Sequence, residues 1–153
     1  MKLYFLFLLI AVTIINFHCG DDNTTTGGNV NTDPGILRTD EFGNELGGDT
    51  TDWCYHNPGS FQFKPAYPNP TAGNVVHVNF DIPVADSVKI YFLKGPSDTT
   101  FFINRMLMAG TYSITINDST GQYTNTYQRV YMKVRNYTPN QFCRFYGDIK
   151  FEP

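Results

Sequence analysis

The chain has few charged residues, and none of them form a basic run. Of its 153 residues, 16% are charged, with 11 Lys and Arg against 14 Asp and Glu, which gives a net charge of −3. Proteins that bind nucleic acid through its phosphates carry clustered positive charge. We therefore expect no nucleic-acid partner for this protein.

Long apolar runs are also scarce, because residues 3–15 (LYFLFLLIAVTII) form the one clear example. A helix that spans a bilayer needs about 20 apolar residues, whereas the apolar part of a secretory signal peptide has about 7–15. Lys2 in front of the run and the polar sequence behind it fit a signal peptide. We expect residues 1–18 to be this signal, and the alternative is a buried N-terminal helix or strand of the folded domain.

Small residues in the A-x-A pattern of a simple cleavage site are missing after Ile15. The sequence CGDDN, which begins at Cys19, resembles instead the start of a mature lipoprotein of a Gram-negative bacterium. Such a signal is cut just before a cysteine that then carries acyl chains, although His18 and Asn16 depart from the residues usual before that cysteine. The resemblance implies lipid attachment (palmitate) at Cys19 and a partner in the membrane itself.

A lipid on Cys19 would place the protein in the cell envelope, as an outer-membrane lipoprotein that faces the periplasm or the cell surface. Two or more acyl chains anchor a protein stably to a membrane without spanning it. The alternative is a secreted protein that has a signal peptide but no lipid.

Cysteine is scarce as well, since only Cys19, Cys54 and Cys143 are present. If Cys19 is acylated, the other two form an even pair in an exported protein, where disulfides persist. A bridge between Cys54 and Cys143 would tie the start of the folded region to its end. Two unpaired, buried thiols are the alternative.

Residues 19–50 contain many Gly, Asn, Thr and Asp residues and few apolar ones. This composition supplies no core and is typical of a flexible or disordered linker. Its acidic residues lack the spacing of an EF-hand calcium loop. We therefore expect residues 19–50 to be a polar tether and residues 51–153 to form a single folded domain.

Helical periodicity is absent beyond the signal, and apolar residues alternate with polar ones instead. The clearest example is residues 74–83 (NVVHVNFDIP), and similar alternation occurs in residues 87–95, 109–118, 128–136 and 142–153, with a less regular pattern in 99–108. Alternation of this kind predicts strands with one buried face. Gly, Pro, Asn and Asp separate the segments, so we expect an all-β fold, an antiparallel β-sandwich.

The motif Tyr67, Pro68, Asn69 and Pro70 precedes the first of these predicted strands. Each proline fixes its own φ and favours an extended conformation in the residue before it. Asn69 between the prolines can turn the chain by bonding nearby backbone. The motif therefore predicts a rigid elbow.

Together with the strand signals behind it, this motif resembles the immunoglobulin-like module of FlgD-type proteins and of type IX secretion C-terminal sorting domains. The matching positions after the motif are Ile82, Pro83, Val88, Ile90, Tyr91, Ala109, Gly110 and Tyr112. Thr71 after the motif and Asn117 before Asp118 depart from the family pattern, and about twenty residues follow the closing strand. The resemblance implies an immunoglobulin- or fibronectin-III-like sandwich. It also implies an alternative function as a secretion sorting domain that directs export or surface attachment.

Catalytic constellations are missing from the sequence. Zinc requires three or four ligands at workable spacing, and Cys54, His56 and Cys143 offer only a partial set that a disulfide would remove. No Ser-His-Asp set is evident, and the aspartates are scattered over predicted strand ends and turns, where they have structural roles. We expect no metal, no cofactor and no enzymatic activity.

Aromatic residues, in contrast, are plentiful, with ten Tyr and thirteen Phe. Tyr123, Tyr127, Tyr131 and Tyr137 lie on or beside one late predicted strand. If exposed, they could stack on sugars or contact a protein, and otherwise they cover the edges of the core. We therefore expect a membrane-anchored, non-catalytic binding or structural module, with a protein or glycan partner at the cell surface.

Overall fold

The computed structural model describes residues 35–57, 59–93, 98–137 and 144–153. The predicted signal peptide, Cys19 and Cys143 lie outside these ranges. Within them, all regular secondary structure is β-strand. No helix in this part of the chain is long and apolar enough to cross a membrane.

The described residues contain nine strands, whose ladders are all antiparallel. The strands are β1 (Leu37–Thr39), β2 (Glu45–Gly48), β3 (Gln62–Phe63), β4 (Val75–Ile82), β5 (Asp86–Leu93), β6 (Thr99–Leu107), β7 (Gly110–Asn117), β8 (Thr126–Val134) and β9 (Tyr146–Phe151). They form a β1-β2 hairpin, a three-stranded sheet of order β3-β4-β7 and a four-stranded sheet of order β6-β5-β8-β9.

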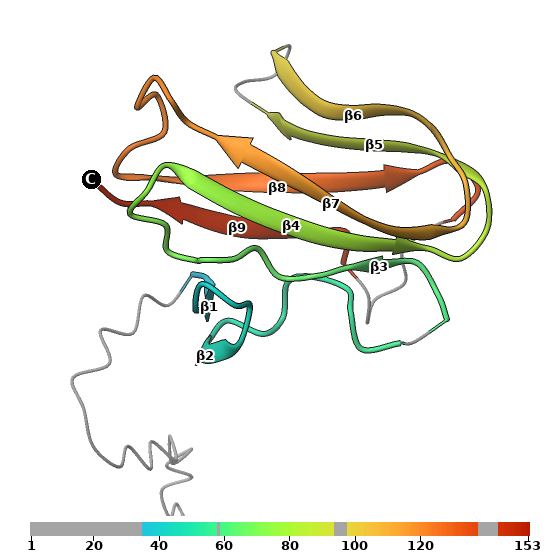
Figure 1. Ribbon diagram of the computed structural model, residues 1–153, viewed down its shortest axis with the longest axis horizontal. Helices are drawn as coiled ribbons and strands as arrows, with labels where there is room; N and C mark the ends of the chain where they lie inside the picture. Colours follow the sequence, from blue (N-terminus) through green and yellow to red (C-terminus); the bar gives the residue numbers. More distant parts are fainter. Residues whose placement is uncertain (1–34, 58, 94–97, 138–143) are drawn as a thin grey trace, which may run out of the picture. The chain divides into compact units, whose positions relative to one another are not determined.

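The two larger sheets form an antiparallel β-sandwich, as the sequence predicted. In Figure 1, β4 and β7 pass over β8 and β9, and one hydrophobic core includes side chains from both sheets. Phe63 and Phe80 enter this core from the three-stranded sheet, and Phe92 and Phe151 enter it from the four-stranded sheet. Each of these four rings is fully buried. This arrangement of sheets identifies a β-sandwich and does not by itself identify the immunoglobulin-like subclass.

The alternating pattern in the sequence identified the buried faces of four strands correctly. The predicted inward residues are buried: Val76, Val78, Phe80 and Ile82 on β4, Val88, Ile90 and Phe92 on β5, Val130, Met132 and Val134 on β8, and Ile149 and Phe151 on β9. The agreement follows from the period of two residues in a strand that buries one face.

The irregular pattern in residues 99–108 has a specific cause. The pairing of β5 with β6 shifts between Ile90 and Tyr91, so that Ile103 pairs with Ile90 and Phe101 pairs with Tyr91. Phe102 is the extra residue of this β-bulge. Two consecutive residues, Phe102 and Ile103, therefore pack against the core, and the alternation changes phase at the bulge.

Part of the expected tether is folded, so the boundary predicted at residue 50 is too late. Strands β1 and β2 form a hairpin, and Ile36 and Leu37 are each only 1% exposed. The polar composition between the strands belongs to a tight turn, where the Asp40 carboxylate accepts hydrogen bonds from the backbone N–H groups of Phe42 and Asn44. Residues 19–34 of the expected tether lie outside the described residues.

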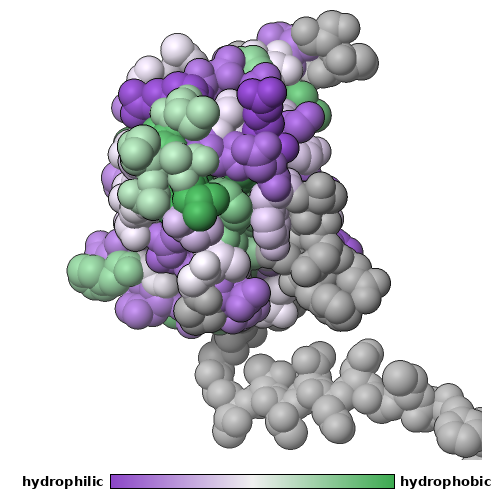
Figure 2. All heavy atoms as spheres, turned by 90° about the vertical axis from the view of Figure 1, so that its right-hand side faces the viewer, coloured by the Kyte–Doolittle hydropathy of each residue, from purple (hydrophilic) through white to green (hydrophobic). Residues whose placement is uncertain are grey.

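Exposed apolar side chains gather at one end of the sandwich. Ile82 pairs with Gly110 and Asp86 pairs with Leu107, so the loop between β4 and β5 lies beside the loop between β6 and β7. Figure 2 looks at this end and shows apolar surface bordered by polar surface. The large apolar side chains here that are more than half exposed are Val84, Met106 and Met108.

Candidate functional site

The motif Tyr67–Pro70 lies between the β1–β2 hairpin and the C-terminal strand. The backbone N–H of Thr39 donates to the Asn69 carbonyl at 2.8 Å, and Asn69 N–H donates back at 3.2 Å. The next residue, Thr71, pairs with Phe151 of β9. The two peptide bonds that precede the prolines are cis. The motif therefore joins the β1–β2 hairpin to β9.

The Asn69 side chain forms three hydrogen bonds that link the motif to β1 and β9. It is completely buried. Its amide nitrogen donates to the carbonyl oxygens of Leu37 at 3.0 Å and Asp148 at 2.9 Å, and its oxygen accepts from Lys150 N–H at 3.0 Å. We expected Asn69 to bond nearby backbone, whereas these partners lie far away in the sequence. Burial of the polar amide is tolerated because its groups find partners.

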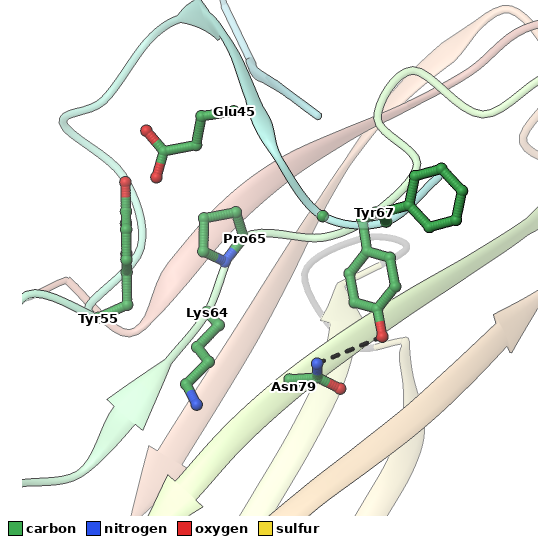
Figure 3. Close-up of a pocket in the computed structure, with 8 residues that line it drawn as sticks. Glu45, Tyr55, Lys64, Pro65, Tyr67 and Asn79 are labelled. Atoms are coloured by element: carbon green, nitrogen blue, oxygen red, sulfur yellow. Dashed lines mark hydrogen bonds between the residues drawn. The ribbon is translucent and has the colours of Figure 1, made fainter. Parts of the chain in front are cut away.

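Beside this motif lies a pocket of about 250 Å³. The turn of the hairpin and β2 form one wall, and the chain around β3 together with β4 forms the other. Figure 3 shows the side chains that line it. They are Phe42, Gly43, Glu45, Tyr55, Lys64, Pro65, Tyr67 and Asn79. Tyr67, predicted as a motif residue, is thus the one member of the motif that reaches this pocket.

Hydrogen-bonding groups are distributed along the pocket. The Tyr67 hydroxyl accepts a hydrogen bond from the Asn79 side-chain amide at 3.3 Å. The Tyr55 hydroxyl is buried and, within the described residues, has no hydrogen bond of good geometry, although the Glu45 carboxylate lies beside it in Figure 3. Burial of the phenol, followed by the adjacent Glu45 carboxylate, raises the pKa of Tyr55 above its usual value. Tyr55 therefore stays protonated and can donate.

The charged groups of the pocket differ in their availability. The Lys64 ammonium is engaged by the Asp81 carboxylate at 2.8 Å. Glu45, in contrast, is an exposed residue of β2, so its carboxylate is accessible to a ligand. The pocket therefore presents acceptor oxygens and hydroxyl groups between aromatic rings. This set of groups can bind a ligand that carries hydroxyl groups.

Of the three residues considered for zinc, the structure describes Cys54 and His56, and each has another partner. Cys54 is buried and disulfide-bonded, and Cys143, its predicted partner, lies outside the described residues. The imidazole of His56 packs against the Tyr55 ring, with centroids 4.0 Å apart. In the parts of the chain that the structure describes, no group of three or more His, Cys, Asp or Glu side chains is placed to hold a metal ion.

The four tyrosines noted in the sequence have different surroundings and do not form one patch. Tyr123 packs on Phe92 with centroids 5.4 Å apart, and Tyr137 packs on Phe61 at 5.0 Å. These two cover edges of the core. Tyr127 is 48% exposed, and its ring lies 5.8 Å from the Lys150 ammonium.

Tyr131 belongs to a row of aromatic rings across the outer face of the four-stranded sheet. Its partner on β5 is Tyr91, with ring centroids 5.4 Å apart and planes 15° from parallel. Phe101 on β6 lies 5.6 Å from Tyr91, and Tyr146 on β9 lies 6.1 Å from Tyr131. These four residues, which we call the aromatic row, contribute one ring from each strand.

Comparison with known proteins gives no match among protein-family models, curated proteins or solved structures. The fold and the site together define a class: an all-β sandwich with a small polar pocket and an aromatic row on separate sheets.

Proposed function

We propose that this protein is a membrane-anchored lipoprotein of the cell envelope whose β-sandwich is a non-catalytic binding module. The anchor rests on the position of Cys19 shortly after the apolar run of residues 3–15. The binding role rests on the pocket beside Tyr67, where aromatic walls and hydrogen-bonding groups converge. Pockets of this kind, with a few placed polar groups, are typical of ligand sites.

The ligand that suits the pocket best is a neutral sugar unit of a glycan. The pocket of about 250 Å³ is smaller than the roughly 300–1,000 Å³ that hold drug-sized molecules. Sugar hydroxyls can donate to the Glu45 carboxylate. The apolar C–H face of a sugar can pack on the rings of Phe42 and Tyr67. An acidic ligand would be disfavoured by Glu45.

The anchor is tested by the intact mass of the protein purified from its native host. We expect a mass that starts at Cys19, carries acyl chains and includes the whole sandwich. In a Cys19→Ala variant we expect the acyl chains to be lost and the protein to leave the membrane fraction. A wild-type mass with no lipid and an intact C-terminus would contradict the proposal and assign a secreted protein.

The pocket is tested by titrating the full chain with a panel of neutral oligosaccharides in calorimetry or NMR. Glu45→Gln removes the carboxylate, and we expect at least a tenfold loss of affinity for any sugar that binds. Glu41→Gln is the matched control, because Glu41 is an exposed residue of the same hairpin that does not line the pocket. Equal affinity in both variants, or no binding of any sugar, would reject this site.

A second candidate function is a sorting module for type IX secretion, and the motif Tyr67–Pro70 with the ordered strand pattern behind it favours this reading. Under that hypothesis, the C-terminal module directs export or surface attachment and is removed or modified afterwards. β9 belongs to the core, since Phe151 is fully buried, so removal of the module would take the sandwich as a unit. The same intact mass distinguishes the two functions, because a mass without the sandwich would support sorting.

A further inference from the structure

Two lysines face each other on the outer side of the four-stranded sheet. Lys89 on β5 pairs in register with Lys133 on β8, and both side chains are exposed. Side chains directly opposite on antiparallel strands have Cβ atoms about 4.5–5.5 Å apart, and like charges in such a pair are destabilising. The repulsion between the two lysines therefore lowers the stability of the sheet, and pairing of the two strands does not depend on having lysine at both positions.

Protection of a sheet edge does not explain these lysines. Lysines are common on edge strands, where they prevent pairing with another chain. In the order β6-β5-β8-β9, however, β5 and β8 are the two inner strands. Proteins tolerate destabilising arrangements, such as this repulsion on two inner strands, mainly at functional sites.

The two lysines belong to a basic groove of about 300 Å³, which is lined by Ser87, Lys89, Lys133 and Arg135. Among the described residues, none of the three cations forms an ion pair. The nearby Asp86 carboxylate is buried and accepts hydrogen bonds from Ser87 N–H and from Asn136. The groove is therefore a local concentration of positive charge in a chain whose net charge is −3.

We propose that the basic groove binds an acidic glycan through one of its oxyanion groups. An oxyanion between Lys89 and Lys133 would replace their mutual repulsion by two attractive contacts. The Arg135 guanidinium can bind two oxygens of a carboxylate, sulfate or phosphate at once. The Ser87 hydroxyl supplies a further donor. Two ammonium groups, a guanidinium and a hydroxyl suit a single oxyanion better than they suit a neutral ligand.

The aromatic row explains why the ligand is a glycan. Tyr91 and Tyr131 lie two residues along the same strands from Lys89 and Lys133, which corresponds to about 7 Å at the rise of a strand. Phe101 in the same row is 47% exposed. An acidic oligosaccharide combines apolar ring faces with charged groups on neighbouring sugar units. One unit can therefore contact an aromatic ring while the oxyanion of a neighbouring unit lies in the groove.

This inference goes beyond the proposed function and does not depend on it. The basic groove lies on the four-stranded sheet, whereas the pocket beside Tyr67 lies against the three-stranded sheet and the hairpin. Binding at the groove requires neither a lipid on Cys19 nor a sugar at Glu45. Failure of one site in the experiments below would leave the other untouched.

The experiment titrates the full chain with oligogalacturonate, an acidic probe, and with a dextran oligosaccharide of the same length as a neutral probe. We expect the wild-type chain to bind the acidic probe at low salt and to bind the neutral one at least tenfold more weakly. Lys89→Gln/Lys133→Gln should lose at least tenfold in affinity for oligogalacturonate, and Lys133→Gln alone should lose part of it. The control is Arg105→Gln, which removes an exposed charge from β6 outside the groove and should change affinity less than twofold.

A second measurement reports on the lysine pair itself. At low salt and without ligand, Lys133→Gln should raise the midpoint of thermal unfolding by a few degrees, because the repulsion is removed. Inorganic sulfate should raise the midpoint of the wild-type chain more than that of Lys133→Gln. Sulfate also stabilises proteins in general by exclusion from their surface, so the comparison with Arg105→Gln isolates the groove.

Three results would overturn the proposal. The first is an equal loss of affinity in Arg105→Gln and in the double variant, which would mean that only overall charge matters. The second is equal binding of the neutral probe. The third is no binding of oligogalacturonate together with binding to vesicles that contain phosphatidylglycerol, which would assign the groove to a membrane surface instead.

Discussion

The indole ring of Trp53 packs directly against Gly147 of β9, where no side chain intervenes. Trp53 is 3% exposed, its ring lies 5.1 Å from that of Phe63, and its backbone N–H donates to the Tyr146 carbonyl at 2.8 Å. The segment before β3 is thereby held against the C-terminal strand. Glycine is required at position 147 because a Cβ there would overlap the indole ring.

Gly147→Ala should therefore lower the free energy of unfolding by about 3 kcal/mol, near the upper range for overpacking in a buried site. Urea denaturation followed by tryptophan fluorescence measures it. Gly73→Ala is the control, because a Cβ at Gly73 would meet no atom within 4 Å, and we expect little change there. Equal losses in the two variants would show that Trp53 does not require the space at Gly147.

Asn69→Ala should destabilise the protein by about 3 kcal/mol, because it leaves buried backbone groups without partners. The groups affected are the carbonyl oxygens of Leu37 and Asp148 and the N–H of Lys150. Chemical denaturation measures the change, with Asn104→Ala on the exposed face of β6 as the control. A loss below about 1 kcal/mol, the size of a single ordinary hydrogen bond, would mean that Asn69 does not hold β1 and β9 together.

The longer sandwich strands were predictable because each buries one face. β4 is the clearest example, since Val76, Val78, Phe80 and Ile82 are all buried and alternate with residues that are not. β6 was less clear for a reason that the sequence does not display, because the bulge at Phe102 depends on its pairing with β5. The alternation within one strand predicts which of its residues are buried. A bulge depends on how two strands pair, so the sequence of one strand does not predict it.

The hairpin and both proposed binding surfaces were not predictable in the same way. Only Ile36 and Leu37 signal burial in the hairpin, and two apolar residues set no period. Lys89 and Lys133 lie on the polar sides of two alternating segments, but their pairing depends on β5 and β8 being neighbours. The contact of Tyr67 with Asn79 likewise arises from tertiary structure. Strand order is not encoded in local pattern, so sites made across strands escape sequence analysis.

The pairing of Cys54 with Cys143 stays a prediction that peptide mapping can test. Cys54 is disulfide-bonded. The residues that follow Cys143 lie against those that precede Cys54, because Arg144 lies 3.9 Å from the Asp52 carboxylate and Tyr146 accepts from Trp53 N–H. We expect a non-reduced digest to contain a peptide that links positions 54 and 143. A link from Cys54 to Cys19 would contradict this pairing and also the lipid on Cys19.

Loss of that disulfide should destabilise the sandwich. The double variant Cys54→Ser/Cys143→Ser should lose about 2–4 kcal/mol in free energy of unfolding, because the open chain gains conformational freedom when unfolded. Urea denaturation with and without reductant measures the effect. The reductant should lower the stability of the wild-type chain and leave the variant unchanged.

Stability should also depend on pH through Asp52, which is 4% exposed. Burial, followed by the negative charge of Asp148, raises the pKa of Asp52 to about 6, whereas an unfolded Asp has a pKa of about 3.9. Between these two values the folded chain holds a proton that the unfolded chain has released. The contribution of Asp52 therefore makes the free energy of unfolding fall as pH rises from about 4 to about 6.

Asp52→Asn removes this contribution, because the amide does not titrate. We expect the variant to be more stable than the wild-type chain at pH 7, by on the order of 2 kcal/mol, and the difference to shrink as pH falls towards 4. Urea denaturation at several pH values measures it, and the difference between the two chains cancels the titration of other groups. Asp98→Asn, at an exposed position, should show no such pH-dependent difference. If Asp52→Asn is no more stable than the wild-type chain at pH 7, the Arg144 guanidinium compensates the buried carboxylate fully, and Asp52 is charged at no cost.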